Sequence, residues 1–181
     1  MIAKDTLSKK HIEAEFKRMK MADPAVLERT MHAFVLLERL ALSDMPFLFK
    51  GGTSLLLALG KPERVSVDID IVCQVPKDKF ESEMKEWVRH PPFTRWENDV
   101  RESDSEPPTR RHYKVFYRGK YGSTATPHYV LLDVVEEACG IAMRNTREVE
   151  IDCPFLLLEG AKSKVRIPNV EIGRASCRER V

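Results

Sequence analysis

Apolar and polar residues alternate from Val65 to Cys73, and this segment constrains the fold more than any other. Successive side chains of a strand point to opposite faces of its sheet. One face is expected to turn toward a core and the other to carry Ser66, Asp68 and Asp70. The residues of the core face are Val65, Val67, Ile69 and Ile71. Aspartate is depleted in strands, and two carboxylates about 7 Å apart on one face repel each other. The pattern predicts a half-buried strand whose carboxylate pair is either a solvated polar face or a site for a hard divalent cation.

A glycine pair precedes this strand. Phe47 to Lys50 is a short apolar stretch that predicts a strand, Gly51-Gly52 predicts a turn, and a helix is expected from Thr53 to Leu59. Glycine lets the backbone approach a ligand closely, and the start of a helix presents N–H groups that suit a phosphate. The hydroxyls of Thr53 and Ser54 add donors, whereas the P-loop motif G-x-x-x-x-G-K-[ST] is absent. Residues 50–54 are a candidate phosphate-binding turn, with a plain structural turn as the alternative.

Asp133 is a third carboxylate of interest, because it lies within the apolar run from Tyr129 to Val135. A carboxylate in an apolar strand must be paired with a cation or bind a metal to offset its desolvation. A salt bridge to an arginine and a place in a metal site are both consistent with the sequence.

The other segments predict an α/β (α+β) domain in which helices flank a mixed sheet. Helices are expected over Lys9–Met21, over Asp78–Val88, and from Pro24 to about Ser43, with Asp23 as the N-cap of the last. Strands are expected at Arg111–Arg118 and Pro127–Glu136, and Arg147–Ile151 is expected to pair with Lys164–Ile167 at an edge. Residues 101–109 are expected to form a polar loop.

The composition excludes several classes of protein. Net charge is +2, from 30 basic and 28 acidic residues, so any attraction to nucleic acid must come from a local surface. The apolar runs are too short to span a membrane, and the start of the chain lacks the plan of a signal peptide. The four cysteines and five histidines show neither zinc-ligand spacing nor a disulfide framework. These features lead us to expect a cytoplasmic protein.

The glycine turn, the Asp68/Asp70 pair and the distant Asp133 together resemble the pattern of the polymerase-beta-like nucleotidyltransferase superfamily, G-[GS]-[ST], D-x-D and a later aspartate. The string FKGGTSLLLALGKPERVSVDIDI, residues 47–71, more specifically resembles the AbiEii/AbiGii toxin family, which carries a K-G-G-[TS] turn and an R-x-S-x-D-I-D strand. The resemblance is strong over residues 47–71, fair over 129–137 and weak before Asp23. It implies a nucleotidyltransferase palm.

The resemblance implies a metal-dependent transfer of a nucleoside monophosphate from a nucleoside triphosphate to an acceptor hydroxyl. Asp68, Asp70 and Asp133 are then the catalytic carboxylates and the ligands of Mg²⁺, or of Mn²⁺. The nucleotide-binding residues are Lys50, Gly51, Gly52, Thr53, Ser54, Arg64 and Ser66. The family also implies a bacterial toxin–antitoxin system linked to phage defence by abortive infection, with a cognate antitoxin as partner and tRNA, other RNA or protein as the acceptor.

Residues 171–181 resemble the translation of a common sequencing adapter rather than natural protein sequence. We therefore expect a catalytic domain over residues 1–170 that is truncated at its C-terminus, where the family carries a lysine motif and a further helical region. The tail is expected to pack against nothing, and Phe155 to Leu158 are expected to form an apolar surface that the missing helices would cover. Two other functions stay open: a nucleotide-binding module without catalysis, and a metal-dependent phosphohydrolase.

Overall fold

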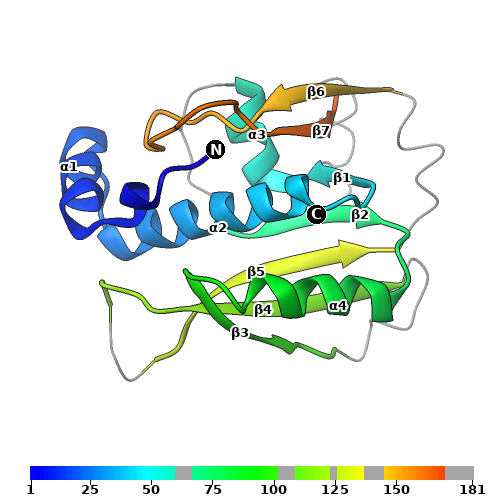
Figure 1. The fold of residues 1–181 in the computed structure, drawn as a ribbon. Coiled ribbons are helices and arrows are strands. Elements are labelled where there is room, and N and C mark those ends of the chain that lie inside the picture. The colour runs from blue at the N-terminus through cyan, green and yellow to red at the C-terminus, as the bar shows by residue number, and fades with distance from the viewer. Residues whose placement is uncertain (60–66, 102–108, 123–125, 137–144, 170–181) are drawn as a thin grey trace, which may run out of the picture.

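The computed structural model of the 181-residue chain describes residues 1–59, 67–101, 109–122, 126–136 and 145–169 (Figure 1). Its main sheet has five strands, and a separate antiparallel pair lies beside it. The order across the main sheet is β1 (Phe47–Lys50), β2 (Ile69–Cys73), β5 (His128–Val135), β4 (Arg110–Tyr117) and β3 (Phe93–Asn98). β2 and β5 are parallel and the other neighbours are antiparallel, so the sheet is mixed, as predicted.

The helices are α1 (Lys9–Met19), α2 (Pro24–Leu42), α3 (Gly51–Leu59) and α4 (Lys77–Trp87), with a short 3-10 helix over Lys4–Leu7. The start of α2 confirms its predicted cap, because the Asp23 side chain accepts a hydrogen bond of 2.8 Å from the N–H of Ala25 and Pro24 occupies the first turn. At the other end, the N–H of Ser43 bonds back to Arg39. None of the described helices is long and apolar enough to cross a membrane.

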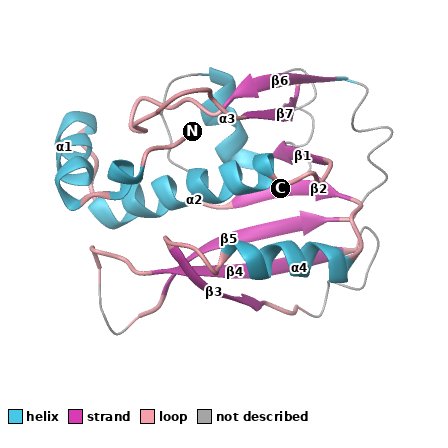
Figure 2. Ribbon diagram, in the orientation of Figure 1, coloured by secondary structure: helices cyan, strands magenta, loops and turns pink. Residues whose placement is uncertain are grey.

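One face of the main sheet forms the core and is covered by α2 and α4 (Figure 2). Alternate residues of β2 and β5, such as Ile69, Ile71 and Leu132, point into this core and have no exposed surface. The ring of Phe80 on α4 stacks on Tyr113 of β4 with 5.7 Å between centroids. The other set of alternate residues, to which Asp70 and Asp133 belong, lies on the opposite face of the sheet.

Several boundaries differ from those that the sequence suggested. Helix α3 begins at Gly51, two residues earlier than expected, so the glycine pair is the first turn of the helix. The strand that carries Asp70 begins at Ile69, and Asp68 directly precedes it. Strand β3 was not expected: only Phe93 of its six residues is buried, and such a polar edge strand lacks a clear alternating pattern. The predicted pair at the C-terminal end exists as β6 (Thr146–Glu150) and β7 (Lys164–Pro168), in a two-stranded sheet of their own.

The prediction of an exposed apolar surface over Phe155 to Leu158 is wrong for its first two residues. Phe155 and Leu156 are buried, and the Phe155 ring packs against Phe34 of α2 with 5.6 Å between centroids. The N-terminal segment covers this region, because the N–H of Ala3 donates to the carbonyl of Leu157 over 2.8 Å. Leu157 itself is 39% exposed. Residues 171–181 lie outside the described part of the chain.

Candidate active site

Four polar side chains form a row across four adjacent strands. Lys50 at the end of β1 pairs with Asp70 of β2, Asp70 pairs with Asp133 of β5, and Asp133 pairs with His112 of β4. Residues paired in this way present their side chains on the same face of a sheet. The fold therefore brings two of the three predicted carboxylates together, although 63 positions separate them in the sequence (133 − 70).

Gly51 lies directly against one of these carboxylates. Its φ of +77° is in the left-handed region, which favours glycine. A Cβ at this position would overlap Oδ2 of Asp70 and lie 2.7 Å from its Cγ. The start of α3 and the carboxylate of Asp70 therefore come together only because residue 51 has no side chain. The positive end of the helix dipole also favours the negative charge of Asp70.

The hydroxyl groups of the glycine turn are directed into the protein. Thr53 is fully buried, and its Oγ1 donates a hydrogen bond of 2.6 Å to the carbonyl of Asp68. Ser54 is also buried, and its Oγ donates to the carbonyl of Gly51 over 2.8 Å. These contacts make both hydroxyls structural ties of the turn. The exposed backbone of Gly51 and Gly52 is the part of the predicted phosphate-binding segment that faces outward.

Asp68 lies close enough to the row for the charge of Asp133 to affect its pKa. Burial raises the pKa of Asp68 above its usual range, the negative charge of Asp133 raises this pKa further, and Arg29 and Arg101 act in the opposite direction. The ionised form of Asp68 is thus disfavoured where it stands. The other two predicted nucleotide-binding residues, Arg64 and Ser66, lie outside the described residues.

Carboxylates are ligands of the kind that a hard divalent cation binds. Within the described ranges, no three His, Cys, Asp or Glu side chains are grouped closely enough to hold a metal ion. The chemistry of the donors nonetheless suits Mg²⁺ or Mn²⁺, because Asp70 and Asp133 offer carboxylate oxygens side by side. A cation beside them would also offset the repulsion that contributes to the raised pKa of Asp68. The donor set therefore fits a hard cation, and the metal role of Asp68, Asp70 and Asp133 stays a prediction.

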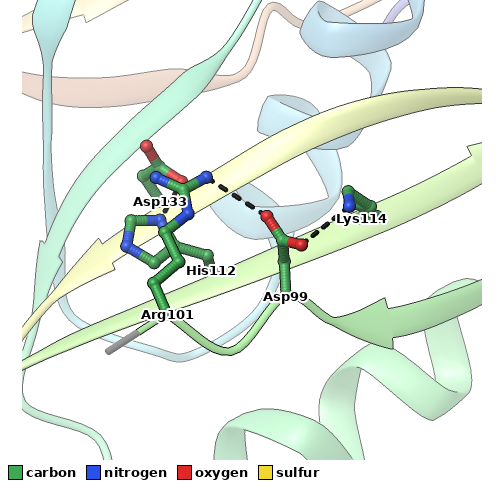
Figure 3. A network of polar contacts seen from close by, with 5 residues as sticks. All are labelled: Asp99, Arg101, His112, Lys114 and Asp133. Carbon is green, nitrogen blue, oxygen red and sulfur yellow. Dashed lines mark hydrogen bonds and ion pairs between the residues drawn. The ribbon is translucent and has the colours of Figure 1, made fainter. Parts of the chain in front are cut away.

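Sequence reasoning did not identify His112 as part of this site. Its Nδ1 lies 2.6 Å from Oδ1 of Asp133, and the His112 side chain is 8% exposed (Figure 3). Metal-ligand spacing, the signal that a histidine can carry in a sequence, is local. The neighbour of Asp133 depends instead on how β4 pairs with β5, and no short motif carries that information.

Three further polar residues, Asp99, Arg101 and Lys114, form a hydrogen-bonded group beside the row. Asp99 accepts hydrogen bonds from Lys114 over 2.7 Å and from Arg101 over 3.2 Å (Figure 3). Arg101 then lines a cavity of about 360 Å³. The lining also includes Asp70, Asp133, His112 and two further basic residues, Lys50 and Arg110. Two carboxylates, one imidazole and three basic side chains thus line one cavity.

Comparison with known proteins agrees with this geometry. Residues 35–170 match the family described as "Nucleotidyl transferase AbiEii toxin, Type IV TA system". No curated protein sequence matches the chain.

Three solved structures resemble the fold, at low sequence identity. A candidate nucleotidyltransferase from H. pylori is 20% identical with a TM-score of 0.51, covering 82% of this chain and 55% of its own. JHP933 from Helicobacter pylori is 19% identical (TM-score 0.47, covering 82% and 53%). An antigenic nucleotidyltransferase-like protein from Paracoccidioides brasiliensis is 19% identical (TM-score 0.46, covering 76% and 60%).

The first of these structures shows that the fold is that of a nucleotidyltransferase, and the chain spans about half the length of the proteins it resembles. The family match extends from within α2 to beyond β7 and includes every described residue of the row. The chain therefore belongs to the AbiEii family of nucleotidyltransferase toxins of type IV toxin–antitoxin systems.

Proposed function

We propose that this chain is the catalytic part of an enzyme that transfers a nucleoside monophosphate from a nucleoside triphosphate to an acceptor hydroxyl. The observation that carries the proposal is the pairing of Asp70 with Asp133 beside the start of α3, in a cavity that basic side chains also line. This arrangement offers oxygen ligands for a cation next to groups that attract phosphate. The membership of the AbiEii family supports the same reaction class.

In this proposal Asp68, Asp70 and Asp133 would hold Mg²⁺, with Mn²⁺ as a substitute. When bound, the metal would supply positive charge that offsets the negative charge of a displacement at phosphorus. The backbone N–H groups at Gly51 and Gly52 face the β- and γ-phosphates, since the start of a helix favours anions. Lys50 and Arg101 both line this cavity and add positive charge to it.

The reaction balances as a single displacement. The oxygen of the acceptor hydroxyl forms a bond to the α-phosphorus, while the bond from this phosphorus to the oxygen that bridges to the β-phosphate breaks. Pyrophosphate leaves with the electron pair of the broken bond. We assign Asp133 as the group that accepts the hydroxyl proton, because it lies in the centre of the row and lines the cavity.

We further propose that the acceptor is RNA, such as the end of a tRNA, and that an antitoxin controls the enzyme in the cytoplasm. The basic lining residues Arg101 and Arg110 favour a polyanionic acceptor over a neutral one. The family description, a toxin of a type IV toxin–antitoxin system, supports a cognate antitoxin.

The proposal is tested by incubating the protein with each α-³²P-labelled nucleoside triphosphate, Mg²⁺ and total bacterial RNA. We expect label in RNase-sensitive material and one pyrophosphate released for each label transferred. Label in protein would move the acceptor to a protein hydroxyl. Release of phosphate or pyrophosphate without any labelled acceptor would favour a phosphohydrolase, and nucleotide binding without turnover would favour a binding module.

A further inference from the structure

Asp133 and His112 lie side by side on one face of the sheet because β5 and β4 are paired. The pairing of β4 with β5 extends over eight consecutive residue pairs, from Arg110 opposite Val135 to Tyr117 opposite His128. A register fixed over this length leaves His112 directly opposite Asp133, with little freedom for either backbone. The register therefore keeps the two side chains within reach of each other on one face of the sheet.

The contact has a defined direction. An ionised carboxylate only accepts hydrogen bonds, so Nδ1 of His112 donates to Oδ1 of Asp133. The distance of 2.6 Å is in the range of strong, charge-assisted bonds. Only 8% of the His112 side chain and 24% of the Asp133 side chain are exposed, so little water competes for the bond. The imidazole therefore fixes the rotation of the carboxylate.

We propose that His112 is a positioning residue, which holds the Asp133 carboxylate in the orientation needed to bind a divalent cation together with Asp70. The proposal rests on the metal-dependent function proposed above, and it adds a residue that the sequence motifs do not contain. Groups that orient a metal ligand typically contribute about 10- to 100-fold to metal affinity or activity. His112 acts through Asp133 and is not assigned any contact with the substrate.

The alternative is that the His112–Asp133 contact only stabilises the sheet. The two roles differ in what they predict for chemically matched substitutions. His112→Phe keeps a ring of similar size but removes the donor. His112→Asn restores an amide N–H close to the position of Nδ1, although its side chain is smaller. If His112 is purely structural, Mn²⁺ affinity should depend on the size of the side chain at position 112. If His112 positions Asp133, Mn²⁺ affinity should depend on whether that side chain has a hydrogen-bond donor.

The test is a titration of the 181-residue protein with Mn²⁺, with free Mn²⁺ measured by electron paramagnetic resonance. We expect His112→Phe to weaken Mn²⁺ binding about 10- to 100-fold and His112→Asn to stay within a few-fold of the unmodified protein. In an Asp133→Asn background, His112→Phe should cause no further loss. Thermal melting verifies that each variant is folded, and His112→Leu, which also lacks a donor, replaces His112→Phe if the latter does not fold.

Unchanged Mn²⁺ binding in folded His112→Phe would overturn the positioning role. So would equal losses in the Phe and Asn variants, or a loss that persists in the Asp133→Asn background. If the unmodified protein does not bind Mn²⁺ at all, both the metal-dependent function proposed above and the role of His112 fail. If the unmodified protein binds Mn²⁺ and one of the three results above is found, only the role of His112 fails.

Discussion

Gly51 at the start of α3 touches the carboxylate of Asp70 on β2 so closely that no side chain fits between them. Gly51→Ala should therefore destabilise the protein by on the order of 3 kcal/mol, from the left-handed backbone and from the overlap with Asp70. Gly160→Ala is the matched control, since Gly160 also has a positive φ, of +64°, but nothing lies within 4 Å of the added Cβ. Its cost should be about 1–2 kcal/mol, from the backbone alone. Urea unfolding of both variants measures the difference, and equal losses would show that the close approach to Asp70 is not constraining.

Thr53 is expected to act on stability before it acts on substrate. Its hydroxyl donates to the carbonyl of Asp68, so Thr53→Val should cost about 1–2 kcal/mol in the free energy of unfolding by leaving this half-buried acceptor without its donor. Thr53→Ser should recover most of this loss. Thr94→Val is the control, because the bond from Thr94 to the carbonyl of Phe116 is longer, at 3.3 Å, and Thr94 itself is exposed. A Thr53→Val protein that melts like the unmodified one but binds nucleotide poorly would point instead to direct contact with phosphate.

His32 should make folding sensitive to acid. Burial lowers the pKa of His32 from 6.5 to about 4, although the hydrogen bond between its ring and the carbonyl of Glu28 acts in the opposite direction. The positive charge of Lys120 contributes to the lowering of this pKa. Between pH 6.5 and pH 4 the imidazole of His32 is protonated in the unfolded chain but stays neutral in the folded protein. The free energy of unfolding therefore falls as the pH decreases through this range. The loss at pH 4.5 relative to pH 7.5 is on the order of 2 kcal/mol.

The test for His32 is its replacement by phenylalanine, which can keep the stacking on Tyr117, where the ring centroids are 3.7 Å apart. The His32→Phe protein should lose about 2 kcal/mol less stability than the unmodified protein between pH 7.5 and pH 4.5. Parallel urea titrations at the two pH values give this difference. Identical pH dependence in both proteins would mean that His32 is not held neutral by the fold.

Asp68 should destabilise the protein when no cation is bound. Its pKa is raised by burial and by the charge of Asp133, so the folded state resists ionisation, and the penalty grows as the pH rises above the ordinary value of 3.8. Asp68→Asn should therefore raise the melting temperature at pH 7 in the presence of EDTA, and the gain should shrink toward pH 4. Addition of Mg²⁺ should stabilise the unmodified protein more than the variant. A lower melting temperature for Asp68→Asn in EDTA would contradict this reading of the site.

The local parts of this structure could be predicted from the sequence. The Asp23-Pro24 start of α2 and the limits of β1 follow from capping and from short apolar runs, and the alternation around Asp133 is visible in the buried and half-buried residues of β5. The side-by-side placement of Asp70 and Asp133 was expected only through a family resemblance. Local patterns specify which face a residue occupies, but they do not specify which strand lies next to it.

The unpredicted parts depend on long-range pairing. His112 enters the row because β4 pairs with β5 in one register, and a shift of a single residue would turn it to the other face. Arg101 lines the cavity and donates a hydrogen bond to Asp99. Asp99 also accepts a hydrogen bond from Lys114, which lies on β4 like His112. The sequence suggests Thr53 and Ser54 as donors to a ligand because it does not show which backbone carbonyls lie within reach of their hydroxyls.

The central claim is that Asp70 and Asp133 form the catalytic centre of a nucleotidyltransferase, and its most direct test is the rate of transfer from α-³²P-labelled nucleoside triphosphate to RNA. Asp70→Asn and Asp133→Asn should each reduce this rate by more than about 100-fold, beyond the usual effect of residues that only orient a ligand. Asp78→Asn, an exposed aspartate in the first turn of α4, should transfer at the unmodified rate. Transfer by folded Asp70→Asn or Asp133→Asn at a rate comparable with that of Asp78→Asn would contradict the account.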